Sequence, residues 1–377
     1  MNVHQAPTLV AETVDRFLAA HGDTAEWERV ASGSEGWSRA RWREMAELGW
    51  LGICLPESAG GLGCGIEERM AVMEAVGRGL VLEPYLSTAV LCAELISAGA
   101  TDLQRAAFLP AIAAGDMVLA FAASEPASRF ETCDVQCTAQ RSGDGWALNG
   151  AKIAVLDAPI ADHLLVLART GGERTNTHGL SVFIVEPAAP GVTMRGYPTL
   201  DRRRCADIEF IDVHVSAGAL VGAESKAFPA VELALDHARV ALCSEAVGIM
   251  DELVTTTIAY LKQRQQFGKP LAQFQVLRHR VADMHIACEQ ARSMAQMASA
   301  TLLLGHPARS ANAAAAKAQA GWSARFVGQQ AVQLHGGMGV SNELRVGHWF
   351  KRLMAIDILL GNADHQVRRF GELVSTH

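Results

Sequence analysis

Two loops between helix-like segments carry residue types that suit a phosphate-bearing ligand. The first, residues 264–270, reads RQQFGKP and combines a guanidinium, an aromatic ring and a glycine turn. An arginine can donate two parallel hydrogen bonds to phosphate oxygens, and a ring offers a flat contact. The second, residues 333–339, reads QLHGGMG, and its glycines allow an anion to approach the backbone N–H groups closely. Glycine loops usually just join helices, so the pair gains weight only with a third loop, Ser124-Glu125-Pro126.

Motifs of several other chemistries are missing from the sequence. No G-x-G-x-x-G follows a strand-like run, and there is no P-loop, G-x-S-x-G elbow or H-E-x-x-H pair. The eight cysteines are scattered, and their one close pair, Cys133 and Cys137, lacks a second pair at zinc-ligand spacing. These absences disfavour nicotinamide, ATP, zinc and serine-hydrolase chemistry. We expect no metal site, and reduced thiols indicate a cytoplasmic protein.

The composition indicates a compact globular protein. Half of the residues are hydrophobic and 19% are charged, which favours a large core over disorder. The formal charge is −7 and no Lys/Arg block occurs, so we expect no nucleic-acid partner. No apolar run is long enough to span a bilayer, and the start MNVHQAPTLVAETV does not resemble a secretory leader. We therefore expect a protein that is neither membrane-bound nor exported.

The hydrophobic periodicity changes twice along the chain. Apolar residues follow helical spacing over residues 8–118. Six short strand-like runs then follow from about residue 119, separated by turn sequences but by no helical crossover. After residue 220 the helical period returns in four long segments, residues 227–264, 274–304, 308–334 and 342–360. The prediction is an α+β fold with an N-terminal helical bundle (1–118), a middle antiparallel β domain of sandwich or barrel type (119–222) and a C-terminal four-helix bundle (223–377).

Five segments in order make the sequence resemble the acyl-CoA dehydrogenase family over essentially its whole length. They are ELGWLGICLPESAGGLG (47–63), the strand with its SEP end (119–126), LNGAKIAVL (148–156), RQQFGKPLAQFQVLRHRVADM (264–284) and QAVQLHGGMGVSNELRVGHWFKRL (330–353). The resemblance implies a subunit of the predicted three-part architecture that binds FAD. It also implies assembly as a homo- or hetero-oligomer, a dimer or tetramer, with related chains.

The resemblance assigns site residues by position. In the family the flavin lies between the β domain and the C-terminal helices, and a neighbouring subunit holds its ADP portion. The implied contacts are Arg264 and Phe267 with the ADP part, Gln333, Gly336 and Gly337 with the pyrophosphate, Ser124 with the flavin ring, Asn362 near the adenine side and Arg239 with substrate.

The family's reaction is the α,β-dehydrogenation of an acyl-CoA thioester. A carboxylate takes the α-proton, and hydrogen bonds to the thioester carbonyl stabilise the developing enolate. The electrons usually pass to an electron-transferring flavoprotein, which the resemblance implies as a partner.

The sequence departs from the family at the catalytic base. The family's usual glutamate before Gly-Thr matches Leu360, and its alternative position matches Ala238, so neither place holds a carboxylate. Glu245 follows Ala238 by nearly two helical turns in the apolar context ALCSEAVG, and burial could tune it as a base. We take Glu245 as the candidate catalytic residue, with a structural, paired carboxylate as the alternative. Glu125 and Asp236 are weaker candidates.

The expected flavin wall differs as well. Ala154 and Leu156 stand where the family commonly has a tryptophan and a threonine, and SRFETC (128–133) replaces a glycine-serine turn. These losses resemble the small subunits of heteromeric acyl-CoA dehydrogenases, such as those acting on pimeloyl-type or steroid side-chain thioesters. Two alternatives therefore stay open beside a flavoenzyme subunit: a catalytically silent partner subunit, and an acyl-CoA oxidase.

Overall fold

The computed structural model describes residues 6–375, and the chain divides into two compact units. The helical unit comprises Met1–Arg29, Gly65–Val81 and Arg239–His377, and the sheet unit comprises Val30–Cys64 and Leu82–Ala238. The predicted succession of helices, strands and helices is confirmed by the element order. The three predicted domain bounds stay predictions. We expected no secretory leader at the start of the sequence, and the first five residues of that stretch lie outside the described residues.

The N-terminal third is helical, as its apolar spacing predicted. Local capping explains where some helices begin: the Thr101 hydroxyl accepts a hydrogen bond from the Gln104 N–H at 3.3 Å, and the Gln104 side chain accepts from the Thr101 N–H at 3.0 Å. This capping box satisfies two backbone donors at the start of α6. The elements are α1 (Ala6–His21), α2 (Thr24–Ser32), α3 (Arg39–Glu47), α4 (Ile66–Gly79), a π-helix (Tyr85–Cys92), α5 (Ala93–Gly99) and α6 (Asp102–Ala113).

The sheet unit is organised around one seven-stranded sheet. The strands are β1 (Leu119–Ala122), β2 (Thr138–Ser142), β3 (Gly145–Leu156), β4 (His163–Arg169), β5 (Leu180–Val185), β6 (Val192–Pro198) and β7 (Arg204–Ser216). Their order is β1-β4-β2-β3-β7-β6, and β5 pairs with β4. The inner strand β4 is buried along nearly its whole length, which explains its continuous run of apolar residues. Trp146 and Phe183 meet edge to face in the core, with ring centroids 5.2 Å apart.

The sheet is mostly antiparallel, as predicted, but two of its strand pairings are parallel. Strand β1 runs parallel to β4, and β2 and β4 share one parallel pairing between Thr138 and Arg169. The sequence interpretation counted only helices as crossovers, whereas here the β2–β3 hairpin and the turn Ala158–Ile160 provide the connection between β1 and β4. Asp162 anchors the parallel pair, since its carboxylate accepts a hydrogen bond from the Val118 N–H at 2.7 Å.

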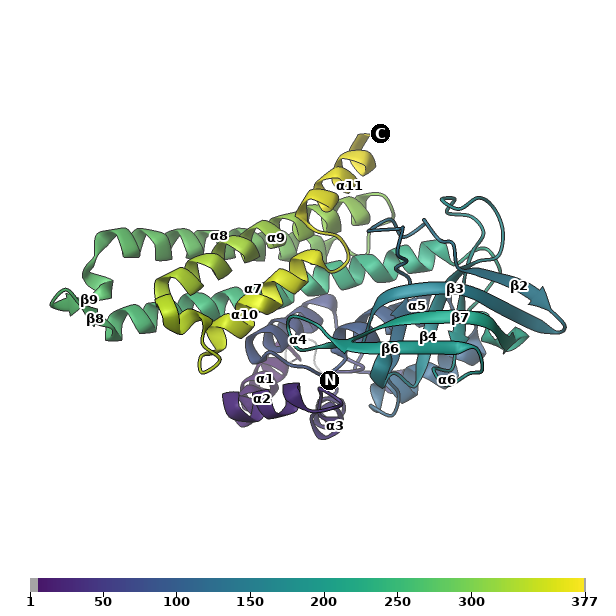
Figure 1. The fold of residues 1–377 in the computed structure, drawn as a ribbon, viewed down its shortest axis with the longest axis horizontal. Coiled ribbons are helices and arrows are strands. Elements are labelled where there is room, and N and C mark those ends of the chain that lie inside the picture. The colour runs from purple at the N-terminus through teal and green to yellow at the C-terminus, as the bar shows by residue number, and fades with distance from the viewer. Residues whose placement is uncertain (1–5, 376–377) are drawn as a thin grey trace. The chain divides into compact units, whose positions relative to one another are not determined.

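The C-terminal helices form a bundle of long segments. They are α7 (Phe228–Gln263), α8 (Gln275–Ala300), α9 (Ala308–His335), α10 (Arg345–Ile358) and α11 (Ala363–Ser375). Helices α8 and α9 lie side by side, and α10 and α11 pack on α9 (Figure 1). Small side chains line the core between α7, α8 and α9, as the alanine-rich sequence suggested: Cys243, Ala295, Ala298, Ala313, Ala316 and Ala320.

Two glycines let α4 and α7 cross closely within the helical unit. A Cβ at Gly77 would clash with the backbone carbonyl of Glu245, and one at Gly248 would clash with that of Glu74. Each helix therefore places a glycine against the other's backbone. This crossing places the backbone of Glu245 directly against Gly77 of α4.

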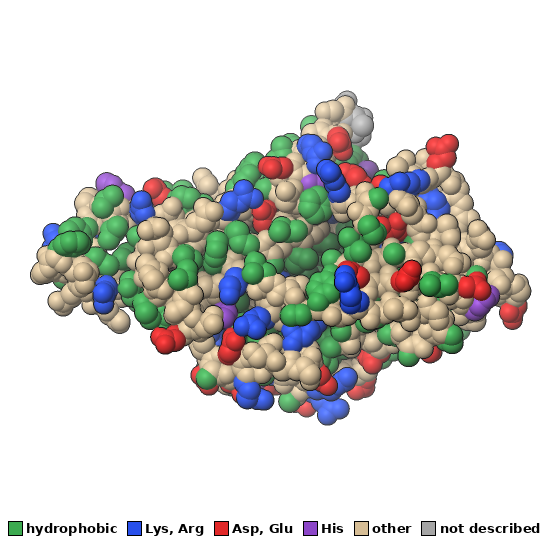
Figure 2. All heavy atoms as spheres, viewed as in Figure 1, with side chains coloured by type: hydrophobic (Ala, Val, Ile, Leu, Met, Phe, Trp, Pro, Cys, Tyr) green, Lys and Arg blue, Asp and Glu red, His purple; other side chains and the backbone are tan. Residues whose placement is uncertain are grey.

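Basic and acidic side chains are interspersed over the visible face (Figure 2). Among the described residues, no helix is both long and apolar enough to cross a membrane.

Candidate functional site

The first predicted loop forms a tight hairpin at the end of α7. Strands β8 (Gln265–Gln266) and β9 (Lys269–Pro270) pair around a two-residue turn, Phe267-Gly268, in which both residues have positive φ (54° and 77°). Such a turn usually holds Asn or Gly at its first position, so Phe267 is strained there by about 1–2 kcal/mol. The residue is also 88% exposed. A strained backbone that presents an exposed aromatic ring lowers the stability of the isolated chain, and this pattern is typical of a ligand contact.

Arg264 precedes this hairpin and is available for a ligand. Its carbonyl accepts a hydrogen bond from the Leu271 N–H at 2.9 Å, which closes the loop. Its side chain is exposed, and no hydrogen bond or ion pair from another described residue engages the guanidinium. Figure 2 shows hydrophobic and basic side chains at the surface of the hairpin end of the helical unit.

The second predicted loop lies near the first because α7 and α9 end together. The ring of His335 stacks on Tyr260 at 4.5 Å between centroids. His335 is buried, its Nδ1 donates to the Ala331 carbonyl at 2.8 Å, and burial lowers its pKa, so the ring is neutral at physiological pH. Gly336 follows with φ 59° and ψ −138°, a backbone conformation that is open essentially to glycine, and it ends α9.

The glycines after α9 leave their backbone open to a ligand. A Cβ at Gly336 or Gly337 would meet nothing within 4 Å in the chain, and Gln333 is exposed on the last turn of α9. The structure thus brings five predicted residues to one end of the helical unit: Arg264, Phe267, Gln333, Gly336 and Gly337. A guanidinium, an amide, open backbone and a flat ring suit a pyrophosphate joined to an aromatic base, so these residues fit the ADP part of FAD.

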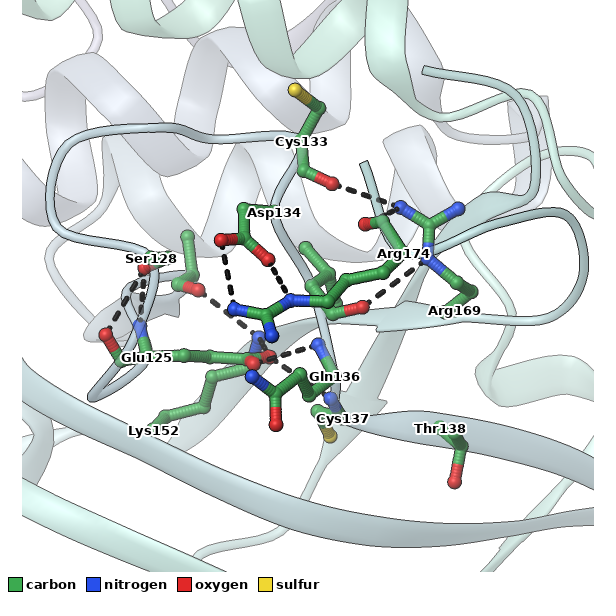
Figure 3. Close-up of polar contacts among 12 residues, drawn as sticks. Glu125, Ser128, Cys133, Asp134, Gln136, Cys137, Thr138, Lys152, Arg169 and Arg174 are labelled. Atoms are coloured by element: carbon green, nitrogen blue, oxygen red, sulfur yellow. Dashed lines mark hydrogen bonds and ion pairs between the residues drawn. The ribbon is translucent and has the colours of Figure 1, made fainter. Parts of the chain in front are cut away.

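In the sheet unit, the SEP loop is fixed by a buried ion pair (Figure 3). The Glu125 carboxylate accepts hydrogen bonds from Lys152 Nζ at 2.7 Å, from the Gln136 N–H at 2.7 Å and from the Cys137 N–H at 3.0 Å. Lys152 is fully buried and also donates to the Ala123 carbonyl at 3.0 Å. With its oxygens satisfied, Glu125 holds the loop and leaves the neighbouring Ser124 exposed.

A second cluster orders the adjacent loops (Figure 3). The Arg169 guanidinium donates to six backbone carbonyls, those of Cys133, Val135, Gly171, Arg174, Asn176 and His178. Asp134 pairs with Arg174, whose Nη2 lies 2.9 Å from Asp134 Oδ2. One buried arginine thereby ties residues 133–135 to the loop 171–178.

The segment after Lys152 has a bulge where the sequence predicted a changed flavin wall. The β3–β7 register shifts between Lys152 and Val155, and Ala154 has φ 50°. Its N–H donates to Asp207 Oδ1 at 3.1 Å. Ala154 is exposed, so the position presents a methyl group where an aromatic ring would offer a stacking surface.

Glu245 has a partner that the sequence did not reveal. Both of its oxygens accept hydrogen bonds from Arg352 on α10, at 2.6 and 2.7 Å, and the two side chains are only 1% and 3% exposed. A carboxylate held bidentately points its lone pairs at the guanidinium rather than at a substrate. The geometry favours the structural alternative, and the catalytic role of Glu245 stays a prediction.

The turn after α10 is held by side-chain hydrogen bonds, although it has no carboxylate at position 360. Leu360 has φ 58° and Gly361 has φ 102°. Asn362 caps α11, because its side-chain oxygen accepts from the His365 N–H at 3.0 Å. Arg239, the predicted substrate contact, is buried on α7 at 2% exposure. The ligand roles of Asn362 and Arg239 stay predictions.

Lys317 on α9 is a residue of this region that was not predicted from the sequence. Lys317 is fully buried and donates to the carbonyls of Asp357 at 3.0 Å and Gly361 at 3.1 Å. A lone lysine within the alanine-rich run of α9 was the available signal, since a charged group on a buried helix face needs a partner.

One cluster of possible metal ligands lies in the helical unit. Among the described residues, Asp251, Cys288 and Glu289 bring ligand atoms within 4.8 Å of one another. Arg292 donates to both carboxylates, with Nε 3.2 Å from Glu289 Oε1. The Arg292 guanidinium therefore supplies the positive charge that these two carboxylates would otherwise take from a metal ion.

Comparison with known families gives the class of this protein. Family models for the N-terminal, middle and C-terminal domains of acyl-CoA dehydrogenase match residues 5–116, 120–213 and 228–374. The chain therefore belongs to the acyl-CoA dehydrogenase family, whose members are FAD-dependent oxidoreductases, and the resemblance seen in the sequence is confirmed.

Individual relatives agree with this assignment. A short-chain specific acyl-CoA dehydrogenase of Megasphaera elsdenii is 31% identical over 336 residues, which cover 86% of each chain. Among solved structures, the ChsE4-ChsE5 complex from Mycobacterium tuberculosis matches 99% of this chain and 98% of its own at 25% identity and a TM-score of 0.89. The FAD complex of PigA matches 100% and 99% at 25% identity and a TM-score of 0.91. These likenesses support FAD as the cofactor.

Proposed function

We propose that the chain is a FAD-binding acyl-CoA dehydrogenase, or a subunit of one, that removes hydrogen from the α and β carbons of an acyl-CoA thioester. The observation that carries this proposal is the exposed, strained Phe267 turn beside the available Arg264 guanidinium. Together with Gln333, Gly336 and Gly337 it forms a surface with the donors that the ADP part of FAD requires. Bound flavin would accept the hydride from the β carbon.

The chain's own residues would orient the reactants. The Glu125–Lys152 pair would keep the SEP loop rigid, so that Ser124 meets the flavin ring from a fixed backbone. Asn362 would approach the adenine side from the start of α11, and Arg239 would act near the substrate. Hydrogen bonds to the thioester carbonyl would stabilise the developing enolate.

The source of the base defines two versions of the proposal. In the first, Glu245 leaves Arg352 and takes the α-proton. In the second, another subunit supplies the carboxylate, and this chain contributes flavin binding and assembly. Leu360 at the matched base position and the bidentate Arg352 contact favour the second version.

Partners follow from the same reasoning. We propose an electron-transferring flavoprotein as electron acceptor and a homo- or hetero-oligomer with a related chain. Support for a mixed assembly comes from the similarity to the ChsE4-ChsE5 complex. Eight free cysteines fit a cytoplasmic location. An acyl-CoA oxidase shares the fold, and it would produce peroxide in a substrate-dependent way.

Arg264→Ala tests the cofactor surface. We expect the purified variant to lose most of its bound flavin, roughly tenfold or more in affinity, because a bidentate contact to phosphate is lost. Arg280→Ala is the matched control, since Arg280 is exposed on α8 of the same unit. Flavin content is read from the visible spectrum. Equal FAD occupancy in the two variants would refute the assignment.

A further inference from the structure

A buried polar cluster surrounds the turn that joins α10 to α11. Lys317 on α9 donates to the carbonyls of Asp357 at 3.0 Å and Gly361 at 3.1 Å, one on each side of Leu360. Gln366 Nε2 donates to the Leu360 carbonyl at 2.6 Å. Three backbone carbonyls in and beside the turn therefore accept hydrogen bonds from side chains on the neighbouring helices α9 and α11.

Asp357 connects the turn to α9 a second time. Its Oδ2 accepts from Arg325 at 2.8 Å, and its Oδ1 accepts from the Ala363 N–H at 3.2 Å. A Cβ at Gly321 would clash with Asp357 Oδ1, so the glycine makes room for this carboxylate. Helix α9 thus presents Lys317, Gly321 and Arg325, one helical turn apart, to the same segment.

The turn needs this support because its backbone is strained. Leu360 has a left-handed conformation (φ 58°), which a residue with a branched side chain rarely adopts. Two backbone hydrogen bonds lie nearby, from the Leu359 N–H to the Ala355 carbonyl and from the Gly361 N–H to the Ile358 carbonyl. Neither of them involves Leu360 itself. Strain of this kind persists only where the surroundings determine the conformation, and it clusters at functional sites.

The charges around Lys317 explain how it can donate from the core. Burial lowers the pKa of Lys317 to about 8. The nearby Arg239 lowers this pKa further, whereas Cys243 and Asp357 act to raise it. At neutral pH Nζ is therefore mostly an ammonium, with more than enough hydrogens for its two carbonyls. His365 on α11 adds no charge there, because burial lowers its pKa to about 4.

We propose that Lys317 is a positioning residue that sets the Leu360–Gly361 turn and so holds the side chain at position 360 in one place. This inference rests on the proposed function, because the turn matters to catalysis only if position 360 faces the acyl group. In that case Leu360 is an apolar wall that helps to select the substrate, at a place prepared to present a side chain.

The test compares two substitutions at Lys317. Methionine has similar length and fills the space but donates nothing, whereas glutamine offers two N–H donors. The measurement is hydrogen–deuterium exchange of the peptide covering residues 355–366. In the Lys317→Met variant, the backbone amides of this peptide should exchange about tenfold faster than in the natural chain. Lys317→Gln should restore most of the protection. A role in filling space alone predicts the opposite order, with Met better than Gln, and that result would overturn the proposal.

A control and a second readout separate this inference from the proposed function. Ser323→Ala removes a different buried polar group of α9, a hydroxyl that accepts from Gln319 at 3.1 Å, and it should leave the turn peptide unchanged. In the FAD-loaded chain, Lys317→Met should weaken butyryl-CoA or longer acyl-CoA binding severalfold while FAD occupancy stays constant. If the natural chain binds no acyl-CoA, the proposed function fails, while the exchange result still decides the role of Lys317.

Discussion

At the residue scale, the buried charges of the helical unit have partners far away in the sequence. Glu245 pairs with Arg352, and Lys317 with the carbonyls of Asp357 and Gly361. The sequence pointed to Glu245 through its apolar neighbours in the chain, and the predicted burial is confirmed by its 1% exposure. It could not show Arg352, because the register of α10 against α7 is set by tertiary packing and not by local spacing.

Glu245→Gln distinguishes a catalytic carboxylate from a structural one. Removing the negative charge that faces buried Arg352 should cost about 3–5 kcal/mol of unfolding free energy, measured by chemical denaturation. Adding Arg352→Met should recover part of this loss. A catalytic residue predicts instead that flavin reduction disappears while stability stays nearly the same, and that outcome would contradict the structural assignment.

At the element scale, periodicity predicted the long helices well. The segments 227–264, 274–304 and 308–334 correspond to α7, α8 and α9 within a few residues, because each has an extended apolar face or an alanine-rich run. The parallel pairing of β1 with β4 was not predictable, since a hairpin served as the crossover. The Phe267-Gly268 turn was recognised as a loop, but its left-handed phenylalanine has no local signal.

The glycines at the α4–α7 crossing give a prediction for element packing. Gly248→Ala should destabilise the chain by about 1–3 kcal/mol, because the new methyl group would clash with the Glu74 carbonyl. Gly371→Ala is the control: a Cβ there meets nothing within 4 Å on α11, and alanine should be neutral or stabilising. Thermal unfolding measures both. Equal effects at the two positions would mean that the helices do not approach as closely as described.

At the scale of the whole molecule, family and architecture were predictable from ordered sequence segments, whereas the arrangement of the site was only partly so. The loops at 264–270 and 333–339 were recognised from residue types, and the structure brings them to one end of the helical unit through the Tyr260–His335 stack. The missing carboxylate at Leu360 was visible in the sequence. The hydrogen bonds that hold the turn at this position were not visible, because Lys317 lies more than forty residues away.

The central claim is that the chain binds FAD in an acyl-CoA dehydrogenase. The most direct measurement is the visible spectrum of the chain purified alone and then mixed with an acyl-CoA under anaerobic conditions. We expect a bound flavin whose absorbance bleaches, either with the chain alone or after co-expression with a related chain that supplies the base. A chain that holds no flavin in either preparation would contradict it.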